Sequence, residues 1–126
     1  MVISKVRLSD FRNFRDKTLT FSDNVTVIVG PNASGKTNLL ESIFLLSTGK
    51  SFKAQIEEEM INYTSGIARA KAKTKDGKIL EVVLTRGEIN IGDNKYEKAP
   101  RKKLLVNNIS KRLIDFSGNF KVVKYS

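Results

Sequence analysis

The stretch that decides the fold is Gly30-Pro31-Asn32-Ala33-Ser34-Gly35-Lys36-Thr37. It fits the phosphate-loop pattern G-x-x-x-x-G-K-[ST] at every fixed position. The preceding residues 25–29 form a β-branched apolar run, which predicts a short strand buried on both faces. The following residues predict a helix from about residue 36 to 47, because Gly49 is a stop signal and apolar side chains recur at helical spacing, namely Leu39, Leu40, Ile43, Phe44 and Leu46.

Each fixed position of the motif has a physical task. Gly30 and Gly35 allow a sharp turn and a close approach of the backbone to a phosphate chain. The backbone N–H groups from Asn32 to Thr37 then point inward as an anion-binding nest at a helix N-terminus. Lys36 reaches the β- and γ-phosphates, and the Thr37 hydroxyl helps to coordinate Mg²⁺. The motif therefore predicts a site for a nucleoside triphosphate and Mg²⁺, although an ordinary Gly/Pro turn is the alternative.

Composition narrows the class of protein. The 126 residues contain 40% hydrophobic and 29% charged residues, which is typical of one soluble globular domain. We expect a cytoplasmic chain without a membrane segment, because no apolar run approaches the roughly 20 residues that span a bilayer. The absence of Cys and His excludes disulfides, thiolate zinc sites and catalysis by Cys or His.

The chain is strongly basic. Lys and Arg number 23 against 13 Asp and Glu, for a formal net charge of +10. Such an excess favours an anionic partner, and nucleic acid is the first candidate. A generic basic surface without a nucleic-acid role is the alternative.

The N-terminal residues predict two strands that lead into the phosphate loop. Val2, Val6 and Leu8 alternate with polar residues, which is typical of a half-exposed strand. Residues 10–15 predict a turn, and residues 17–21 a second short strand. Beyond Gly49, residues 50–53 predict a basic loop, and residues 55–62 a short helix.

From Ile67 onward the pattern predicts antiparallel β structure. Arg69, Lys71, Lys73 and Lys75 alternate with small or polar residues, so we expect these charges to share one face. The return strand spans residues 79–85. An odd-length loop with Gly77 in a left-handed bulge places Lys71 near Glu81 and Ala72 near Leu80, whereas a two-residue loop mixes the two faces. We predict the odd-length loop.

The remaining residues predict shorter elements. We expect a strand at residues 88–91 that turns back at 92–94, an exposed strand or loop at 95–103, and an apolar strand at 104–106 that ends at the turn Asn107-Asn108. Residues 112–116 predict a helical turn, and residues 120–125 a final strand. Because the chain stops within this strand, we expect it to be part of a larger domain.

Hydrolysis of a triphosphate requires a carboxylate on an apolar strand to hold Mg²⁺ and a group that orients water. The nearest candidate, Ile79-Leu80-Glu81, belongs to the basic hairpin. We therefore expect this chain to bind the nucleotide, and to hydrolyse it only together with further segments.

Three segments resemble one known family. They are Leu8-x-x-Phe11-Arg12-Asn13-Phe14, the phosphate loop continued as Asn38-Leu39-Leu40-Glu41-Ser42-Ile43, and Thr48-Gly49-Lys50-Ser51-Phe52-Lys53. This order resembles the N-terminal part of the RecF family of bacterial DNA replication and repair proteins, which are related to SMC and ABC-type ATPases. The resemblance is clear to about Lys53 and loose beyond it.

The resemblance implies an α/β fold, lobe I of an ABC-type ATPase head, in which a phosphate-loop core (about residues 1–50) adjoins an antiparallel β subdomain (about 63–126). It also implies ATP control of DNA binding at gaps or single-/double-strand junctions, other recombination mediators as partners, and an ATP-dependent homodimer. The chain departs from the family by lacking the coiled-coil-like lobe, the signature motif and the Mg²⁺-holding carboxylate.

The resemblance further implies roles for individual residues. Arg12 and Asn13 become candidates for nucleotide contacts, with a capped turn as the alternative, and Asn38 extends the phosphate loop. Lys50 and Lys53 become candidates for DNA contacts, with a solvated loop as the alternative. A solvated sheet face is the alternative to DNA contact for Arg69, Lys71 and Lys73.

Three functions compete at this point. The first is an ATP-controlled DNA-binding protein of the RecF type. The second is an ATPase head of another phosphate-loop family, such as a transporter head without a DNA role. The third is a truncated module that binds nucleotide or DNA without hydrolysis.

Overall fold

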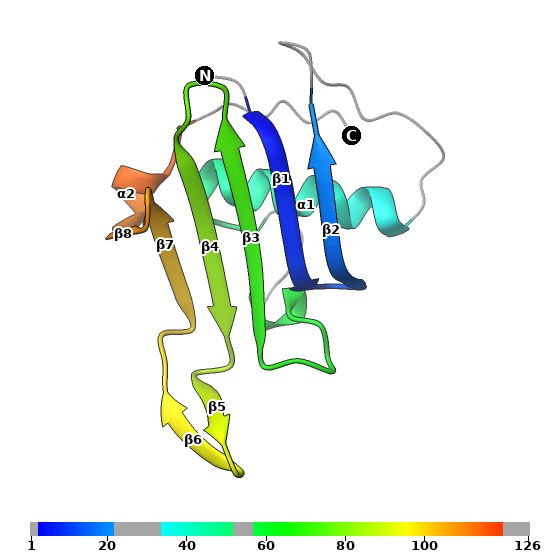
Figure 1. Ribbon diagram of the computed structural model, residues 1–126, viewed down its shortest axis with the longest axis vertical. Helices are drawn as coiled ribbons and strands as arrows, with labels where there is room; N and C mark the ends of the chain where they lie inside the picture. Colours follow the sequence, from blue (N-terminus) through cyan, green and yellow to red (C-terminus); the bar gives the residue numbers. More distant parts are fainter. Residues whose placement is uncertain (1–2, 22–33, 52–56, 120–126) are drawn as a thin grey trace.

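A computed structural model of the chain describes residues 3–21, 34–51 and 57–119. Its elements are β1 (Ile3–Phe11), β2 (Phe14–Thr20), α1 (Ser34–Thr48), the 3-10 helix η1 (Glu57–Met60), β3 (Ile67–Thr74), β4 (Ile79–Thr85), β5 (Glu88–Gly92), β6 (Lys95–Lys98), β7 (Lys102–Val106), β8 (Ile109–Lys111) and α2 (Leu113–Phe116). Six strands form one sheet in the order β2-β1-β3-β4-β7-β8, and every neighbouring pair is antiparallel. β5 and β6 form a separate two-stranded sheet, which extends from the end of the main sheet as an arm (Figure 1).

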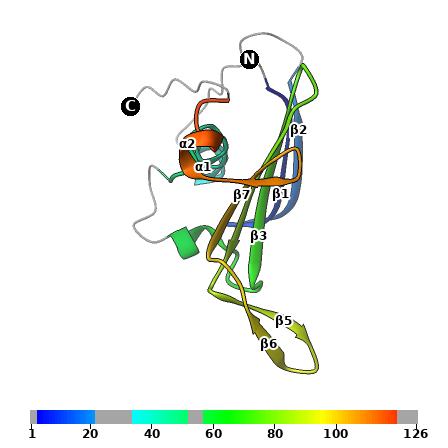
Figure 2. The same cartoon turned by 90° about the vertical axis from the view of Figure 1, so that its left-hand side faces the viewer.

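The two helices lie on the same face of the six-stranded sheet (Figure 2). The core fills the space between this face and α1. It contains side chains from the four central strands, α1 and α2, including Val6, Leu8, Ala70, Leu80, Val82, Leu45, Leu46 and Phe116. The other face of the sheet carries no helix in the described part of the chain (Figure 2).

The alternation in β1 agrees with the prediction and then shifts by one residue. Val6 and Leu8 are buried, whereas Lys5 and Arg7 are exposed. The next core residue is Phe11, three positions beyond Leu8, and Asp10 has a φ of +50°. The left-handed backbone conformation of Asp10 shifts the alternation by one residue, so that the Phe11 side chain points into the core. The predicted turn at residues 10–15 is therefore shorter, because β1 continues to Phe11 and β2 begins at Phe14.

The predicted register of the basic hairpin is confirmed. Lys71 lies opposite Glu81 and Ala72 opposite Leu80. The loop has an odd length, with Gly77 at a φ of +91° and a backbone bond of 3.0 Å from Gly77 N to Thr74 O. The Thr74 hydroxyl donates to Asp76, and this hydrogen bond lowers the pKa of the Asp76 carboxyl. Lys75 lies in the turn rather than on the strand, so the hairpin presents three of the four expected charges in one row.

The later strands follow the predicted turns. Asp93-Asn94 connects β5 to β6, and Asn107-Asn108 connects β7 to β8; all four residues have positive φ, as tight hairpin turns require. β8 was not expected. The short helix predicted at residues 55–62 is the 3-10 helix η1. The strands predicted at 25–29 and 120–125 lie outside the described residues.

Helix α1 is two residues longer at its start than predicted and buries a different set of side chains. Ile43 and Leu46 are buried as expected, but Leu39, Leu40 and Phe44 are only partly buried. Their place is taken by Leu45 and by polar groups, namely Asn38, Glu41, Ser42 and Ser47. The buried face of α1 therefore includes polar residues, and the spacing of its apolar residues alone does not predict that face.

One continuous sheet joins the predicted phosphate-loop core (about residues 1–50) to the predicted β subdomain (about 63–126). β1 pairs with β3 over six register positions, from Ile3 opposite Thr74 to Ser9 opposite Arg69. The division into a core at about residues 1–50 and a β subdomain at about 63–126 stays a prediction. No helix among the described residues is long and apolar enough to cross a membrane.

Gly49 offers a test of how α1 ends. It has a φ of +79°, and an added Cβ would lie 2.6 Å from Leu113 Cδ1 and 3.3 Å from Leu104 Cδ1. We expect Gly49→Ala to lower the free energy of unfolding by roughly 2–4 kcal/mol, from left-handed strain of about 1–2 kcal/mol plus crowding. Gly77→Ala is the control, because Gly77 also has positive φ but no atom within 4 Å of an added Cβ, so it should lose only about 1–2 kcal/mol. Equal losses in urea unfolding would contradict the contact at Gly49.

Candidate functional site

The phosphate-loop motif ends inside the first turn of α1. The helix begins at Ser34, so the backbone of Ser34, Gly35, Lys36 and Thr37 forms its N-terminus. This first turn carries no acidic residue that could occupy the unpaired N–H groups. Gly30, Pro31, Asn32 and Ala33 lie outside the described residues, as do the side chains of residues 34–37. The described backbone thus fits an anion at this helix N-terminus.

A buried ion pair joins the next turn of α1 to the turn between β1 and β2. Arg12 Nε lies 2.8 Å from Glu41 Oε1, and Arg12 Nη2 lies 2.9 Å from Glu41 Oε2. The Glu41 side chain is 0% exposed and that of Arg12 is 18% exposed. Ser51 Oγ also donates to Glu41, at 3.1 Å. The carboxylate therefore accepts three hydrogen bonds and is well compensated for its burial.

The ion pair also raises the pKa of the Arg12 guanidinium. The hydrogen bonds to Glu41 raise the pKa of Arg12, and the negative charges of Glu41 and Glu59 act in the same direction against partial burial. The guanidinium consequently stays charged, and two of its five donors serve Glu41.

A second contact runs parallel to the ion pair. Asn38 Nδ2 donates to Asn13 Oδ1 at 3.2 Å. Asn38 and Glu41 are three residues apart, so they share one side of α1, while Arg12 and Asn13 are adjacent in the turn. The structure thus brings together Arg12, Asn13 and Asn38, three of the residues that the sequence nominated, directly after the motif.

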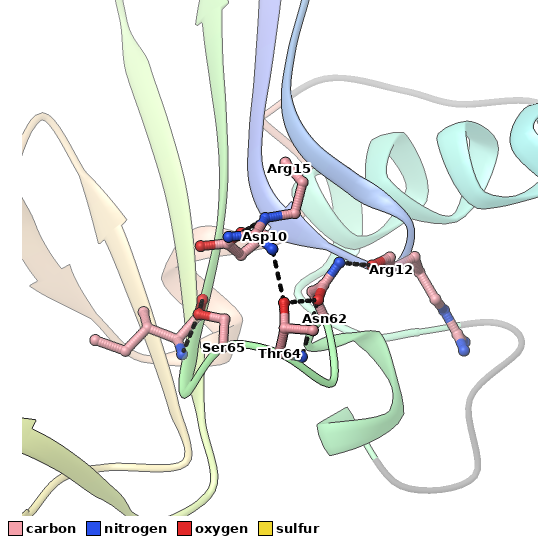
Figure 3. A network of polar contacts seen from close by, with 7 residues as sticks. Asp10, Arg12, Arg15, Asn62, Thr64 and Ser65 are labelled. Carbon is pink, nitrogen blue, oxygen red and sulfur yellow. Dashed lines mark hydrogen bonds and ion pairs between the residues drawn. The ribbon is translucent and has the colours of Figure 1, made fainter.

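The segment that follows η1 fixes the backbone of this turn. Arg12 N donates to Met60 O at 2.7 Å, and Asn62 N donates to Asp10 O at 2.8 Å. The Asn62 side chain donates to Arg12 O at 2.8 Å and accepts from Thr64 (Figure 3). Arg15 adds an ion pair with Asp10 at 2.8 Å and a hydrogen bond to Thr64. Arg12, which has a φ of +51°, is therefore held from both sides.

The basic residues nominated for DNA lie in two places. Arg69, Lys71 and Lys73 are exposed on the face of the sheet opposite α1. Lys50 is exposed just beyond the end of α1, and Lys53 lies outside the described residues. The structure therefore does not join Lys50 to the row on β3.

The described carboxylates do not gather near the helix start in a form that could hold a metal. No group of three or more Asp or Glu side chains with metal-binding geometry occurs among the described residues. Glu81, the nearest candidate in the sequence, faces away from α1 and lies 3.9 Å from Lys71 Nζ.

Sequence reasoning missed two residues of this site. Glu41 belongs to the family pattern, and a carboxylate among apolar helix residues is a signal of a buried partner that could have identified its role. Asn62 gave no signal, because its contacts depend on chain segments 50 residues apart.

Comparison with known proteins places this geometry in a family. Residues 2–121 match the family described as the RecF/RecN/SMC N-terminal domain. The chain belongs to this family.

Individual relatives of the RecF/RecN/SMC family agree with the match. A DNA replication and repair protein RecF from Oenococcus oeni is 34% identical over 130 residues, which cover 100% of this chain and 31% of that protein. The RecF protein from Shouchella clausii is also 34% identical and is covered to 32%. The chain therefore spans about a third of the length of these relatives.

Solved structures of this family share the fold. The recombination mediator protein RecF-ATP in the RecFOR pathway matches with a TM-score of 0.76 and 26% identity, covering 98% of this chain and 32% of that one. The corresponding RecF-ATPrS structure matches with a TM-score of 0.73 and 27% identity, over 94% of this chain and 30% of that one. The expected fold class, lobe I of an ABC-type head, is confirmed.

The Arg12–Glu41 pair yields a testable prediction about stability. We expect Arg12→Gln to lower the free energy of unfolding by about 3–5 kcal/mol, because it leaves a buried carboxylate without its cation. Arg7→Gln is the control: it removes the Arg7–Asp16 pair, whose side chains are 58% and 62% exposed, and should cost about 1 kcal/mol or less.

A double-mutant cycle with Glu41→Gln separates the pair from its surroundings. The double variant should lose clearly less than the sum of the two single losses, since neither remaining group is left charged and buried. Additive losses in chemical denaturation would show that the two side chains do not interact.

Proposed function

We propose that this chain is the ATP-binding lobe of a RecF-like protein of DNA repair, recombination and replication that binds DNA under ATP control. The observation that carries the proposal is the phosphate-loop motif at the N-terminus of a helix that a buried ion pair holds to the sheet. Membership of the RecF/RecN/SMC family and likeness to RecF structures with ATP support it. A cytoplasmic location is part of the proposal.

In this proposal the nucleotide lies against the N-terminus of α1. Gly30, Pro31, Asn32, Ala33, Ser34, Gly35, Lys36, Thr37 and Asn38 form its phosphate site. Lys36 contributes a point charge to the β- and γ-phosphates, and Thr37 ligates Mg²⁺ with its hydroxyl. The bound Mg²⁺ neutralises charge on the phosphate oxygens.

Arg12 and Asn13 complete the site from the turn between β1 and β2. Two donors of Arg12 bond to Glu41, and in this proposal the other donors of the guanidinium serve a phosphate of the nucleotide. Asn38 and Glu41 then determine where this turn lies relative to the helix start.

DNA binding in this proposal uses the basic side chains outside the nucleotide site. The contacts come from Arg69, Lys71 and Lys73 on the sheet and from Lys50 and Lys53 after α1. Because these are phosphate contacts, affinity should fall steeply as salt rises. Gapped DNA or single-/double-strand junctions, recombination mediators and a second copy of the protein are the proposed partners.

A module that binds ATP without hydrolysing it is a second candidate, favoured by one observation. Glu81, the carboxylate that ends an apolar run, lies on the sheet face opposite α1. We expect no single-turnover hydrolysis above background when this chain is mixed with ATP and Mg²⁺. Phosphate release at a rate that falls with Lys36→Ala would exclude this candidate. The match to the RecF/RecN/SMC family argues against a transporter head.

The nucleotide site is tested by Lys36→Ala. We expect this variant to lose ATP binding, because the charge on the β- and γ-phosphates is removed, while the thermal midpoint changes little. Lys98→Ala on the exposed strand β6 is the matched control and should bind as the unmodified chain does. Titration with a fluorescent ATP analogue gives the affinities, and unchanged affinity in Lys36→Ala would contradict the assignment.

A further inference from the structure

The arm exposes hydrophobic side chains and unpaired strand edges at one place. It is the two-stranded sheet of β5 and β6, which extends beyond the end of the main sheet (Figure 2). Tyr96 on β6 is 59% exposed and Ile91 on β5 is 57% exposed. Neither strand of the arm pairs with any other strand in the described part of the chain. Unpaired edges of this kind are templates for pairing with another strand.

The backbone bonds at the base of the arm show which groups of β6 form its free edge. Ala99 N donates to Gly87 O at 3.0 Å, so Ala99 directs its backbone groups toward the β5 side. Hydrogen-bonded and non-hydrogen-bonded pairs alternate along antiparallel strands. Glu97 therefore also faces β5, whereas the N–H and C=O groups of Tyr96 and Lys98 point away from it. These groups are available to a further strand.

The charges of β6 are arranged symmetrically about Tyr96. Lys95 precedes it and Glu97 follows it. Neither of these two charged residues forms an ion pair with a residue that the structure describes. Edge strands often carry charges of one sign, which repel a second copy of the same strand. The opposite signs on β6 give no such protection.

Only one symmetric register of two β6 strands matches these charges. Centring an antiparallel pair on Lys95 places two lysines opposite each other, and centring it on Glu97 places two glutamates opposite each other, which destabilises the pair. Centring it on Tyr96 places each Lys95 opposite a Glu97. In that register the two Tyr96 residues form a hydrogen-bonded pair, because their backbone groups face outward. Each Lys95 and Glu97 then form a non-hydrogen-bonded pair, in which opposed Cα atoms are about 4.5 Å apart and side chains approach most closely.

We infer that the free edge of β6 binds the same edge of a second copy of the protein, in antiparallel register about Tyr96. The two arms together form one four-stranded sheet, and the contact is isologous, with each copy giving the same residues. It is a weak contact, since a strand of this length buries much less than the roughly 800 Å² per partner of a stable interface. The inference goes beyond the proposed function, because the arm contains no residue of the nucleotide site and the contact needs no ATP.

The experiment exchanges charges across the symmetry axis. Lys95→Glu leaves two acidic residues beside Tyr96, and Glu97→Lys leaves two basic ones, so each variant repels its own copy. The swapped variant, which combines both changes, restores opposite charges at unchanged net charge. Lys111→Glu is the control, because it makes the same charge change on the exposed strand β8. Sedimentation equilibrium without nucleotide measures self-association of each full chain, at protein concentrations up to the order of 1 mM.

We expect each single variant on β6 to self-associate on the order of 10-fold more weakly than the unmodified chain, because two attractive pairs become repulsive. An equal mixture of Lys95→Glu and Glu97→Lys should associate about as well as the unmodified chain, and so should the swapped variant. Lys111→Glu should leave association unchanged. Recovery in the mixture is not expected of an effect of net charge or of a damaged fold.

A proline at the centre of the register gives a second measurement. Tyr96→Pro removes the N–H group that donates to the second copy, and it removes no bond to β5, because that group points away from β5. We expect this variant to lose self-association while its thermal midpoint and its affinity for ATP change little.

Other results would overturn the inference. A chain that stays monomeric at every concentration excludes the contact. Self-association that neither charge variant weakens, or that the mixture does not recover, excludes this register. ATP titration of the same samples tests the proposed function separately: a monomeric chain that still binds ATP overturns this inference alone, whereas a chain that self-associates as expected but binds no ATP contradicts only the nucleotide site.

Discussion

The buried pair between Arg12 and Glu41 is the contact on which the rest of the site depends. One member lies in the turn between β1 and β2, and the other in α1, one turn beyond the phosphate-loop motif. Each would be costly to bury alone, so the turn and the helix are held at one mutual distance. The backbone bonds from Met60 and Asn62 then fix the turn against the β3 side of the sheet. The start of α1 is thereby positioned by side-chain chemistry at its second turn.

Successive residues of each strand point to opposite faces of the sheet, so the two faces carry different kinds of side chain. Inward residues of β1, β3 and β4 are small or apolar and pack in the core with α1, while outward residues of β1 and β3 are mostly cationic. The same strands therefore pack against α1 with their inner side chains and present a row of cations on the opposite side of the sheet. The small side chains Ala68, Ala70 and Ala72 are buried at the centre of the inner face, and larger residues there would move the helix outward.

The sequence indicated those features that depend on local chemistry. The Asp-Gly turn determined the register of β3 and β4, because only one loop length keeps Ala72 and Leu80 on the same face. The start of α1 followed from the motif to within two residues. The buried face of α1 did not, because Glu41 and Asn38 are buried by partners that lie 29 and 25 residues away. The shift at Asp10 was also hidden, since a non-glycine residue with positive φ leaves no mark in an apolar pattern. Strand β8 was too short to predict from three residues of mixed character.

The arm formed by β5 and β6 is closed at its base by bonds that do not involve its tip. Thr85 N donates to Arg101 O, Thr85 Oγ1 donates to Pro100 O, and Ala99 N donates to Gly87 O. These bonds continue the pairing of β4 with β7 beyond the ends of the two strands, where the backbone leaves the main sheet. Residues can consequently be added or removed in pairs beyond Gly87 and Ala99 without changing how β4 meets β7. This makes the arm a natural place to insert a reporter peptide.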